Sequence, residues 1–205
     1  ANKWTNSGVM TWTDENGTPH QNTGKADFTP KTEYVKDGSK SGSYNAITKK
    51  ITWTVVANYT QRKLVNASIV DPIVEGRTYV DESAVLYTAT INRDGSLGAL
   101  VKVDAITPTY DEKNKIVNVN LPEGSTAVYV LKFDTSLDNQ VIDQKTYDNK
   151  ATYSNDGKST DLTASVTVKN SGTVVTKTGE QDKSDSSYAN WQIWVNQSQS
   201  TVKDV

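Results

Sequence analysis

Apolar and polar residues alternate along most of the chain with a period of two. Ile51, Trp53, Val55 and Ala57 occupy one set of alternate positions, and mostly polar residues lie between them. Because successive side chains of a β-strand point to opposite faces, this pattern predicts a strand with one buried face. The same alternation occurs in the segments 67–71, 85–91, 101–103, 117–121 and 129–133.

Short turn signals separate these segments. The dipeptides Asp94-Gly95, Glu123-Gly124 and Asp156-Gly157 are typical of tight connections between strands. We expect about eight or more strands, and no stretch of the chain has a convincing helical pattern. The sequence therefore predicts an all-β protein, folded as an antiparallel β-sandwich.

Composition and charge exclude several classes of function. The chain has 205 residues, no cysteine, one histidine and a formal net charge of -2. Disulfide scaffolds, cysteine zinc sites and thiol nucleophiles are therefore impossible. The charge balance lacks the basic field that nucleic-acid binding needs, and no apolar run approaches the roughly 18 residues of a membrane span. His20 and the acidic residues lie mainly in turns, so we expect no metal and no cofactor.

Similar segments recur at the two ends of the chain. The segment 147–157 resembles 4–17, and the segment 176–196, with its tryptophan and asparagine, resembles 35–58. These matches indicate a repeat of about 140 residues. We expect residues 1–29 to be the last strands of a preceding repeat, 30–169 a complete domain, and 170–205 the first strands of a following repeat, all belonging to a longer surface protein.

Three polar residues fall on strand faces that are otherwise apolar. Lys36 shares strand parity with Tyr34, Asp71 with Ile69, and Asn149 with its apolar neighbours. Burying an isolated lysine or aspartate costs several kcal/mol unless the group is paired or neutralised. The three groups are therefore expected to meet, either as a buried ion pair that Asn149 completes by hydrogen bonding or as a reactive centre.

The reactive alternative is a covalent cross-link. A desolvated lysine loses its proton and becomes a nucleophile, while a buried carboxyl group has a raised pKa and stays protonated. Such an acid can polarise the asparagine carbonyl and transfer protons while ammonia leaves. The product is an isopeptide bond between Lys36 and Asn149, with Asp71 as the assisting acid, formed once by the chain on itself.

The order of these motifs resembles the collagen-binding-domain family of Gram-positive surface adhesins. The similarity rests on Lys36 and on the segments 51–58, 65–72 and 147–151. It implies an immunoglobulin-like sandwich of the variant type with extra strands, a lysine–asparagine isopeptide bond and a catalytic aspartate. By motif position these roles fall on Lys36, Asn149 and Asp71. Three other lysines lie near Lys36 and remain alternatives for the cross-link: Lys40, Lys49 and Lys50.

The terminal pieces carry possible cross-link residues of their own. Asn6 corresponds to Asn149, and Lys177 corresponds to Lys36. The two could meet only if the end segments came together, within one molecule or between neighbours. Because the counterpart of Asp71 is missing, we expect no covalent bond there.

These observations favour a non-enzymatic adhesin module on the Gram-positive cell wall surface. Its expected partners are a host extracellular-matrix protein such as collagen and the neighbouring repeats of the same chain. Nucleic acid is not expected as a partner. The alternative function is that of a carbohydrate-binding accessory domain of a secreted protein, although the acidic residues are not paired as glycoside hydrolysis would require.

Overall fold

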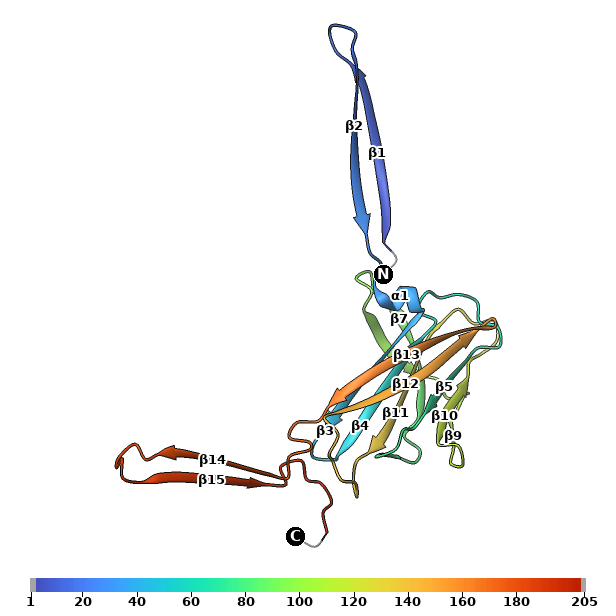
Figure 1. Ribbon diagram of the computed structural model, residues 1–205. Coiled ribbons are helices and arrows are strands. Elements are labelled where there is room, and N and C mark those ends of the chain that lie inside the picture. Colours follow the sequence, from blue (N-terminus) through green and yellow to red (C-terminus); the bar gives the residue numbers. More distant parts are fainter. Residues whose placement is uncertain (1–2, 204–205) are drawn as a thin grey trace.

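The computed structural model describes residues 3–203, which form a central β-sandwich with a β-hairpin projecting from each of two sides (Figure 1). Among these residues, no helix is long and apolar enough to cross a membrane. The helix α1, Thr32–Lys36, is a single turn at the entrance to the sandwich.

Two antiparallel sheets make up the sandwich, which confirms the predicted fold class. The five-stranded sheet has the order β13 (Lys158–Thr167), β12 (Thr146–Asn155), β5 (Ser68–Pro72), β10 (Ile116–Asn120) and β9 (Thr109–Asp111). The six-stranded sheet has the order β3 (Gly38–Asn45), β4 (Lys50–Ala57), β11 (Val128–Ser136), β7 (Val85–Ile91) and β8 (Leu97–Lys102), with β6 (Thr78–Tyr79) paired to β11.

The core lies between the sheets and follows the alternation of the sequence. Trp53 on β4 pairs with Phe133 on β11, and both side chains are fully buried. On β12, Tyr147, Ala151 and Tyr153 point into the same core, while the residues between them face outward. Each large apolar side chain buried in this way contributes about 1.5–3 kcal/mol, so the facing strands are held in register by their inner faces.

The edge strands β3 and β13 bring the two sheets together on one side of the sandwich. A Cβ atom on Gly42 of β3 would lie 2.5 Å from the Val166 side chain of β13, and one on Gly38 would lie 3.1 Å from Leu162. Glycine at these positions therefore permits a close approach of β3 to β13. This approach places the inner face of β3 opposite the inner faces of β12 and β13.

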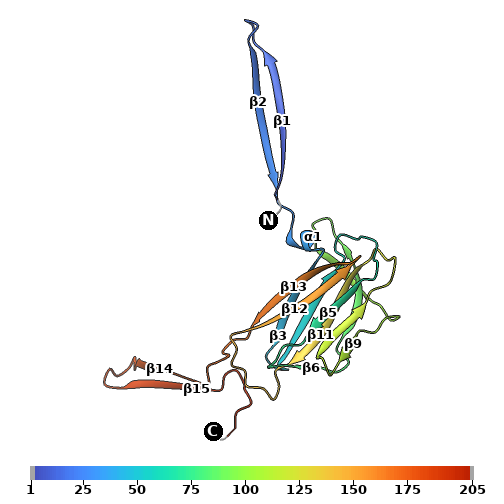
Figure 2. The ribbon, with the colours of Figure 1, turned by 45° about the vertical axis from the view of Figure 1, so that its right-hand side comes forward.

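The flanking hairpins lie outside the sandwich. Strands β1 (Trp4–Thr13) and β2 (Pro19–Phe28) form one hairpin, and β14 (Val175–Gln181) and β15 (Ala189–Val195) form the other. The two views agree that they extend from different ends of the sandwich (Figure 2). The expected boundaries after residues 29 and 169 fall in the connecting segments, whereas residues 1 and 205 lie outside the described part. The assignment of the hairpins to neighbouring repeats stays a prediction.

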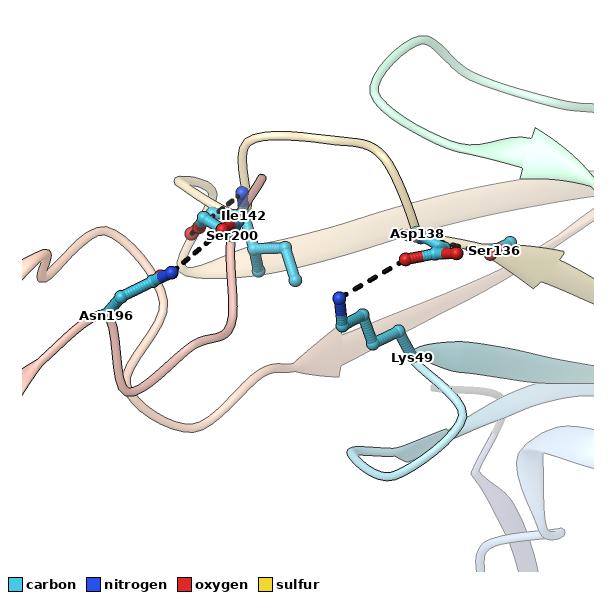
Figure 3. Close-up of polar contacts among 6 residues, drawn as sticks. All are labelled: Lys49, Ser136, Asp138, Ile142, Asn196 and Ser200. Atoms are coloured by element: carbon cyan, nitrogen blue, oxygen red, sulfur yellow. Dashed lines mark hydrogen bonds and ion pairs between the residues drawn. The ribbon is translucent and has the colours of Figure 1, made fainter. Parts of the chain in front are cut away.

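The segment after β15 turns back onto the sandwich (Figure 3). The Ile142 backbone N–H donates to Ser200 Oγ at 2.9 Å, and the Thr201 N–H donates to the Gln140 carbonyl at 2.9 Å. Asn196 Nδ2 donates to the Ser200 carbonyl at 2.9 Å and holds the turn that follows β15. The base of the β14–β15 hairpin is therefore anchored, while its strands remain free of the sandwich.

Candidate functional site

A lysine and an aspartate meet in the core between the two sheets. Lys40 lies on β3 and Asp71 on β5, and Lys40 Nζ donates a hydrogen bond to Asp71 Oδ2. Both side chains are 0% exposed. The pairing of Lys40 with Val55 on β4 and of Asp71 with Val117 on β10 fixes the two strand positions. The ion pair therefore links the two sheets through the core.

Burial shifts both groups of this pair toward their neutral forms. Desolvation raises the pKa of Asp71, and the charge and hydrogen bond of Lys40 oppose that rise only in part. Desolvation likewise lowers the pKa of Lys40 against the influence of Asp71, and the positive charge of Arg77 lowers it further. Burial therefore shifts the pair toward a neutral amine and a protonated carboxyl group.

Asn149 on β12 completes the cluster. Its side chain is buried, and its carboxamide is among the groups that lower the pKa of Asp71, so it lies beside that carboxyl group. Neither Asn149 Nδ2 nor Oδ1 makes a hydrogen bond of ordinary geometry with any residue that the structure describes, and the same holds for Asp71 Oδ1. An amide with no fixed partner next to an amine and a carboxyl group is an unusual element of a core, because buried polar atoms are normally satisfied.

Aromatic rings enclose the lysine. Lys40 Nζ lies 5.4 Å from the ring centroid of Trp53 and 5.3 Å from that of Phe133. Trp53 Nε1 donates to Thr135 Oγ1 at 3.0 Å, which fixes the indole. A Cβ atom on Gly42 would lie 2.7 Å from the Trp53 ring, so a glycine is needed for the ring to lie against β3. These rings exclude water from the amine.

Arg77 is a buried charge that the sequence pattern did not reveal. Its Nη2 donates to the Asp148 carbonyl at 2.6 Å, and its guanidinium carbon lies 5.5 Å from the Trp53 ring and 5.6 Å from the Tyr147 ring. Its Nε and Nη1 have no hydrogen-bond partner among the described residues. Arg77 precedes β6 in an irregular segment, where no periodic pattern could have predicted burial.

The structure does not bring Lys36 to Asp71, which corrects the predicted position of the lysine. Lys36 ends the helix α1, and its Nζ lies 3.5 Å from the Asp161 carbonyl at the surface. Asp37 adopts a left-handed φ of 55°, and strand β3 begins only at Gly38. The strand parity assumed for Lys36 therefore does not apply.

Of the three alternative lysines, Lys40 occupies the core position. Lys49 forms a surface ion pair with Asp138 at 3.2 Å (Figure 3), and Lys50 begins strand β4 at a partly exposed position. Asp71 and Asn149 lie in the core at the positions that the alternation indicates.

A signal in the sequence could have selected Lys40. The segment Lys40-Ser41-Gly42 precedes Trp53, and Lys177-Thr178-Gly179 precedes Trp191 at a similar distance. In both hairpins the glycine pairs with the tryptophan across the strands. Lys36-Asp37-Gly38 has the same Lys-x-Gly pattern, but Gly38 lies 15 residues before Trp53, against 11 for Gly42 and 12 between Gly179 and Trp191. The glycine-to-tryptophan spacing therefore aligns Lys177 with Lys40 and not with Lys36.

Asn6 and Lys177 lie apart from this cluster. Asn6 is on β1, paired with Ala26, and is exposed. Lys177 is on β14, with its Nζ 4.7 Å from the Trp191 ring centroid. The hairpins that carry them do not meet in this structure (Figure 1).

One comparison with known proteins identifies a family. Residues 35–163 match the family described as collagen binding domain, and this range includes all of the buried cluster. No curated protein matches the chain.

Among solved structures, the collagen-binding subdomain of the Enterococcus faecalis surface protein ACE is similar at 12% identity and a TM-score of 0.49, covering 64% of this chain and 96% of that one. The collagen-binding domain of a Staphylococcus aureus adhesin shows 18% identity and a TM-score of 0.45, covering 62% and 96%.

A structure of ACE concerned with ligand binding by the collagen hug model has 14% identity and a TM-score of 0.50, covering 78% of this chain and 59% of that one. This last similarity supports the immunoglobulin-like fold. Because the family match spans more than half of its residues, this chain belongs to the collagen binding domain family.

Proposed function

We propose that this protein is a module of an extracellular adhesin on the Gram-positive cell wall, that it binds a matrix protein of the collagen type, and that an isopeptide bond between Lys40 and Asn149 closes its sandwich. The observation that carries the cross-link is the fully buried pair of Lys40 and Asp71 beside the unbonded carboxamide of Asn149. Family membership supports the adhesin role.

The proposed reaction uses only the three side chains. The neutral Nζ of Lys40 attacks Asn149 Cγ while the protonated Asp71 donates a hydrogen bond to Asn149 Oδ1. A proton then passes from Nζ through the Asp71 carboxyl group to the amide nitrogen, the Cγ–Nδ2 bond breaks and ammonia leaves. The new Cγ–Nζ bond remains, and Asp71 ends the reaction as it began. Fixed positions in the core replace the collisions that make this reaction negligible between free side chains.

The bond would join the two sheets covalently. Lys40 is on the six-stranded sheet and Asn149 on the five-stranded sheet. Closing a loop of about 100 residues stabilises a fold by about 4–5 kcal/mol through the unfolded chain. The bond would also give mechanical resistance, because a load applied between β3 and β12 would pass through a covalent bond and not through hydrogen bonds between strands.

Intact mass spectrometry tests the cross-link. The wild-type chain is expected to weigh less than its sequence mass by one ammonia. Lys40→Ala, Asp71→Ala and Asn149→Ala should each restore the full mass, whereas the matched control Lys36→Ala should keep the loss. An unmodified wild-type mass contradicts the cross-link, and a full mass in Lys36→Ala would return the role to that lysine.

Binding to immobilised collagen tests the ligand, with fibronectin as the comparison. We expect saturable binding to collagen that exceeds binding to fibronectin. Equal binding to both would contradict a collagen-type partner and would leave the cross-link unaffected. Immobilised polysaccharide serves as the negative control, because no described residue cluster favours the carbohydrate-binding alternative.

A further inference from the structure

Each flanking hairpin has one polar face and one uncovered apolar face. On β1–β2, alternate positions place four large side chains together, with exposed fractions of 66% for Trp4, 67% for Met10, 43% for Trp12 and 61% for Phe28. The opposite face of that hairpin carries mainly threonine, serine and charged residues. An isolated two-stranded hairpin is marginally stable in water, and an apolar face of this kind marks an interaction site.

The hairpin β14–β15 has the same character. Trp191, Ile193 and Val195 are 65%, 59% and 65% exposed, and Val175 on the neighbouring strand is 59% exposed. The register places these four side chains on one face together with Lys177. The face is therefore apolar apart from Lys177 and Gln181.

The register of β14–β15 repeats that of β3–β4. The pair Lys177–Ile193 corresponds to Lys40–Val55. In each hairpin a Cβ atom on the paired glycine would contact the tryptophan ring, at 2.6 Å from Cε3 of Trp191 for Gly179 and 2.8 Å from Cε3 of Trp53 for Gly42. The following turns also agree, because Asn196 Nδ2 donates to the carbonyl four residues later as Asn58 Nδ2 does. The two hairpins are therefore copies of one structural unit.

The register of β1–β2 in turn repeats that of β12–β13. Asn6 pairs with Ala26 as Asn149 pairs with Ala164. The same alignment equates the pair Trp4–Phe28 with the pair Tyr147–Val166. It also equates the pair Gly8–Gly24 with the pair Ala151–Leu162. In the sandwich the corresponding side chains of β12 and β13 are buried. The flanking hairpins thus present the two halves of an interface that already exists once within the molecule.

The side chains at the contact points are complementary in size. In the sandwich, Gly38 of β3 lies against Leu162 of β13. In the alignment, Val175 replaces Gly38 and Gly24 replaces Leu162. The larger residue is therefore on the other strand of the contact, and its partner is still a glycine. The pair of Gly42 and Val166 becomes Gly179 and Phe28, and the glycine stays opposite the large side chain. Compensated exchange of this kind preserves packing.

We propose that the apolar face of β1–β2 in one copy of the protein binds the apolar face of β14–β15 in a second copy, in the arrangement that β12–β13 and β3–β4 adopt in the sandwich. Among the described residues, the two hairpins of one chain extend from different ends of the sandwich, so these two faces meet only between two copies (Figures 1 and 2). The contact is heterologous, so it produces chains or rings of copies. This inference does not depend on the proposed cross-link or ligand.

The contact is non-covalent. The arrangement places Lys177 opposite Asn6, as Lys40 lies opposite Asn149. The two apolar faces carry no aspartate or glutamate, so no acid is available to assist the reaction that we propose for the core. Copies should therefore separate under denaturing conditions.

Light scattering after size-exclusion chromatography tests the proposal with full-length variants. The wild-type mass should rise above that of a monomer with increasing concentration. Trp191→Asp and Phe28→Asp should each be monomeric alone, since each lacks one half of the contact. An equimolar mixture of the two should form a dimer that grows no further, because one intact face remains on each copy.

The matched control is Trp194→Asp, on the polar face of β15, which should associate as the wild type does. The dissociation constant of the disrupted variants should rise by at least about tenfold. A monomeric wild type at all concentrations, or self-association of Trp191→Asp alone, would overturn the proposal. Circular dichroism of each variant checks that the sandwich stays folded, which matters most for Phe28→Asp because Phe28 lines a cavity with residues 93–95 of the sandwich.

Discussion

The hairpins β3–β4 and β14–β15 have the same register but different surroundings. Each places a lysine two residues before a glycine that lies under a tryptophan ring. In β3–β4 the ring is fully buried, and Lys40 contacts Asp71. In β14–β15 the ring is 65% exposed, and Lys177 forms no ion pair with any residue that the structure describes.

The difference shows where the chemistry of the lysine originates. The hairpin supplies the position of the amine and the Trp53 ring, whereas the facing sheet supplies the carboxyl group and the carboxamide. Burial lowers the pKa of Lys40 because β5 and β12 cover it from one side while the Trp53 and Phe133 rings enclose it from its own sheet. A reactive lysine is therefore a property of the closed sandwich and not of its local sequence.

Removal of the two lysines gives the largest expected contrast. Lys40→Ala should lower the free energy of unfolding by about 4–5 kcal/mol, because the proposed cross-link is lost. Lys177→Ala should change it by less than about 0.5 kcal/mol, as is usual for an exposed residue. Denaturant unfolding measures both. If the two variants lost similar amounts of unfolding free energy, Lys40 would contribute no more to stability than the exposed Lys177, and the proposed cross-link would be contradicted.

Substitution of the two glycines gives a smaller contrast. Gly42→Ala should destabilise the sandwich by about 1–3 kcal/mol, since the added methyl group would lie 2.5 Å from Val166 and 2.7 Å from Trp53. Gly179→Ala meets only the exposed Trp191 ring, which can move. The melting temperature should therefore fall for Gly42→Ala alone. An equal fall for both would mean that β14–β15 is packed as tightly as β3–β4.

A pH titration compares β12 with its exposed counterpart β1. Burial raises the pKa of Tyr153 to about 12 from the usual 10.0. The folded state holds this proton more tightly, so the stabilisation is complete below pH 10 and is lost as the pH rises toward 12. The loss amounts to about 3 kcal/mol. Tyr153→Phe should remove this decline, whereas Met10→Leu, at the equivalent exposed position on β1, should leave it. A decline that persists in Tyr153→Phe would assign it to another group.

The strands and two of the three cluster residues could be predicted from alternation alone. Trp53, Asp71 and Asn149 lie on the faces that their neighbours indicate, because each is inside a regular strand. Lys36 was misplaced because a single helical turn and a left-handed Asp37 separate it from β3. The alternation of inward and outward side chains along β3 therefore cannot be extended back through this turn to Lys36.

The burial of Arg77 had no local signal. Its environment consists of the Trp53 and Tyr147 rings, which come from two different sheets. Only the tertiary arrangement brings these rings together. The two flanking hairpins show the opposite case, since their alternation is regular but no sheet of the same molecule covers them.

The complete burial of Lys40 and Asp71 also isolates their protons from the solvent. An ammonium beside a carboxylate contains the same number of protons as an amine beside a carboxylic acid, so the pair can interchange these forms without exchange with water. Over the pH range in which the pair neither gains nor loses a proton, the share of the neutral form is set by the protein interior. The proposed maturation of the domain would then proceed at a rate that does not change with pH within that range.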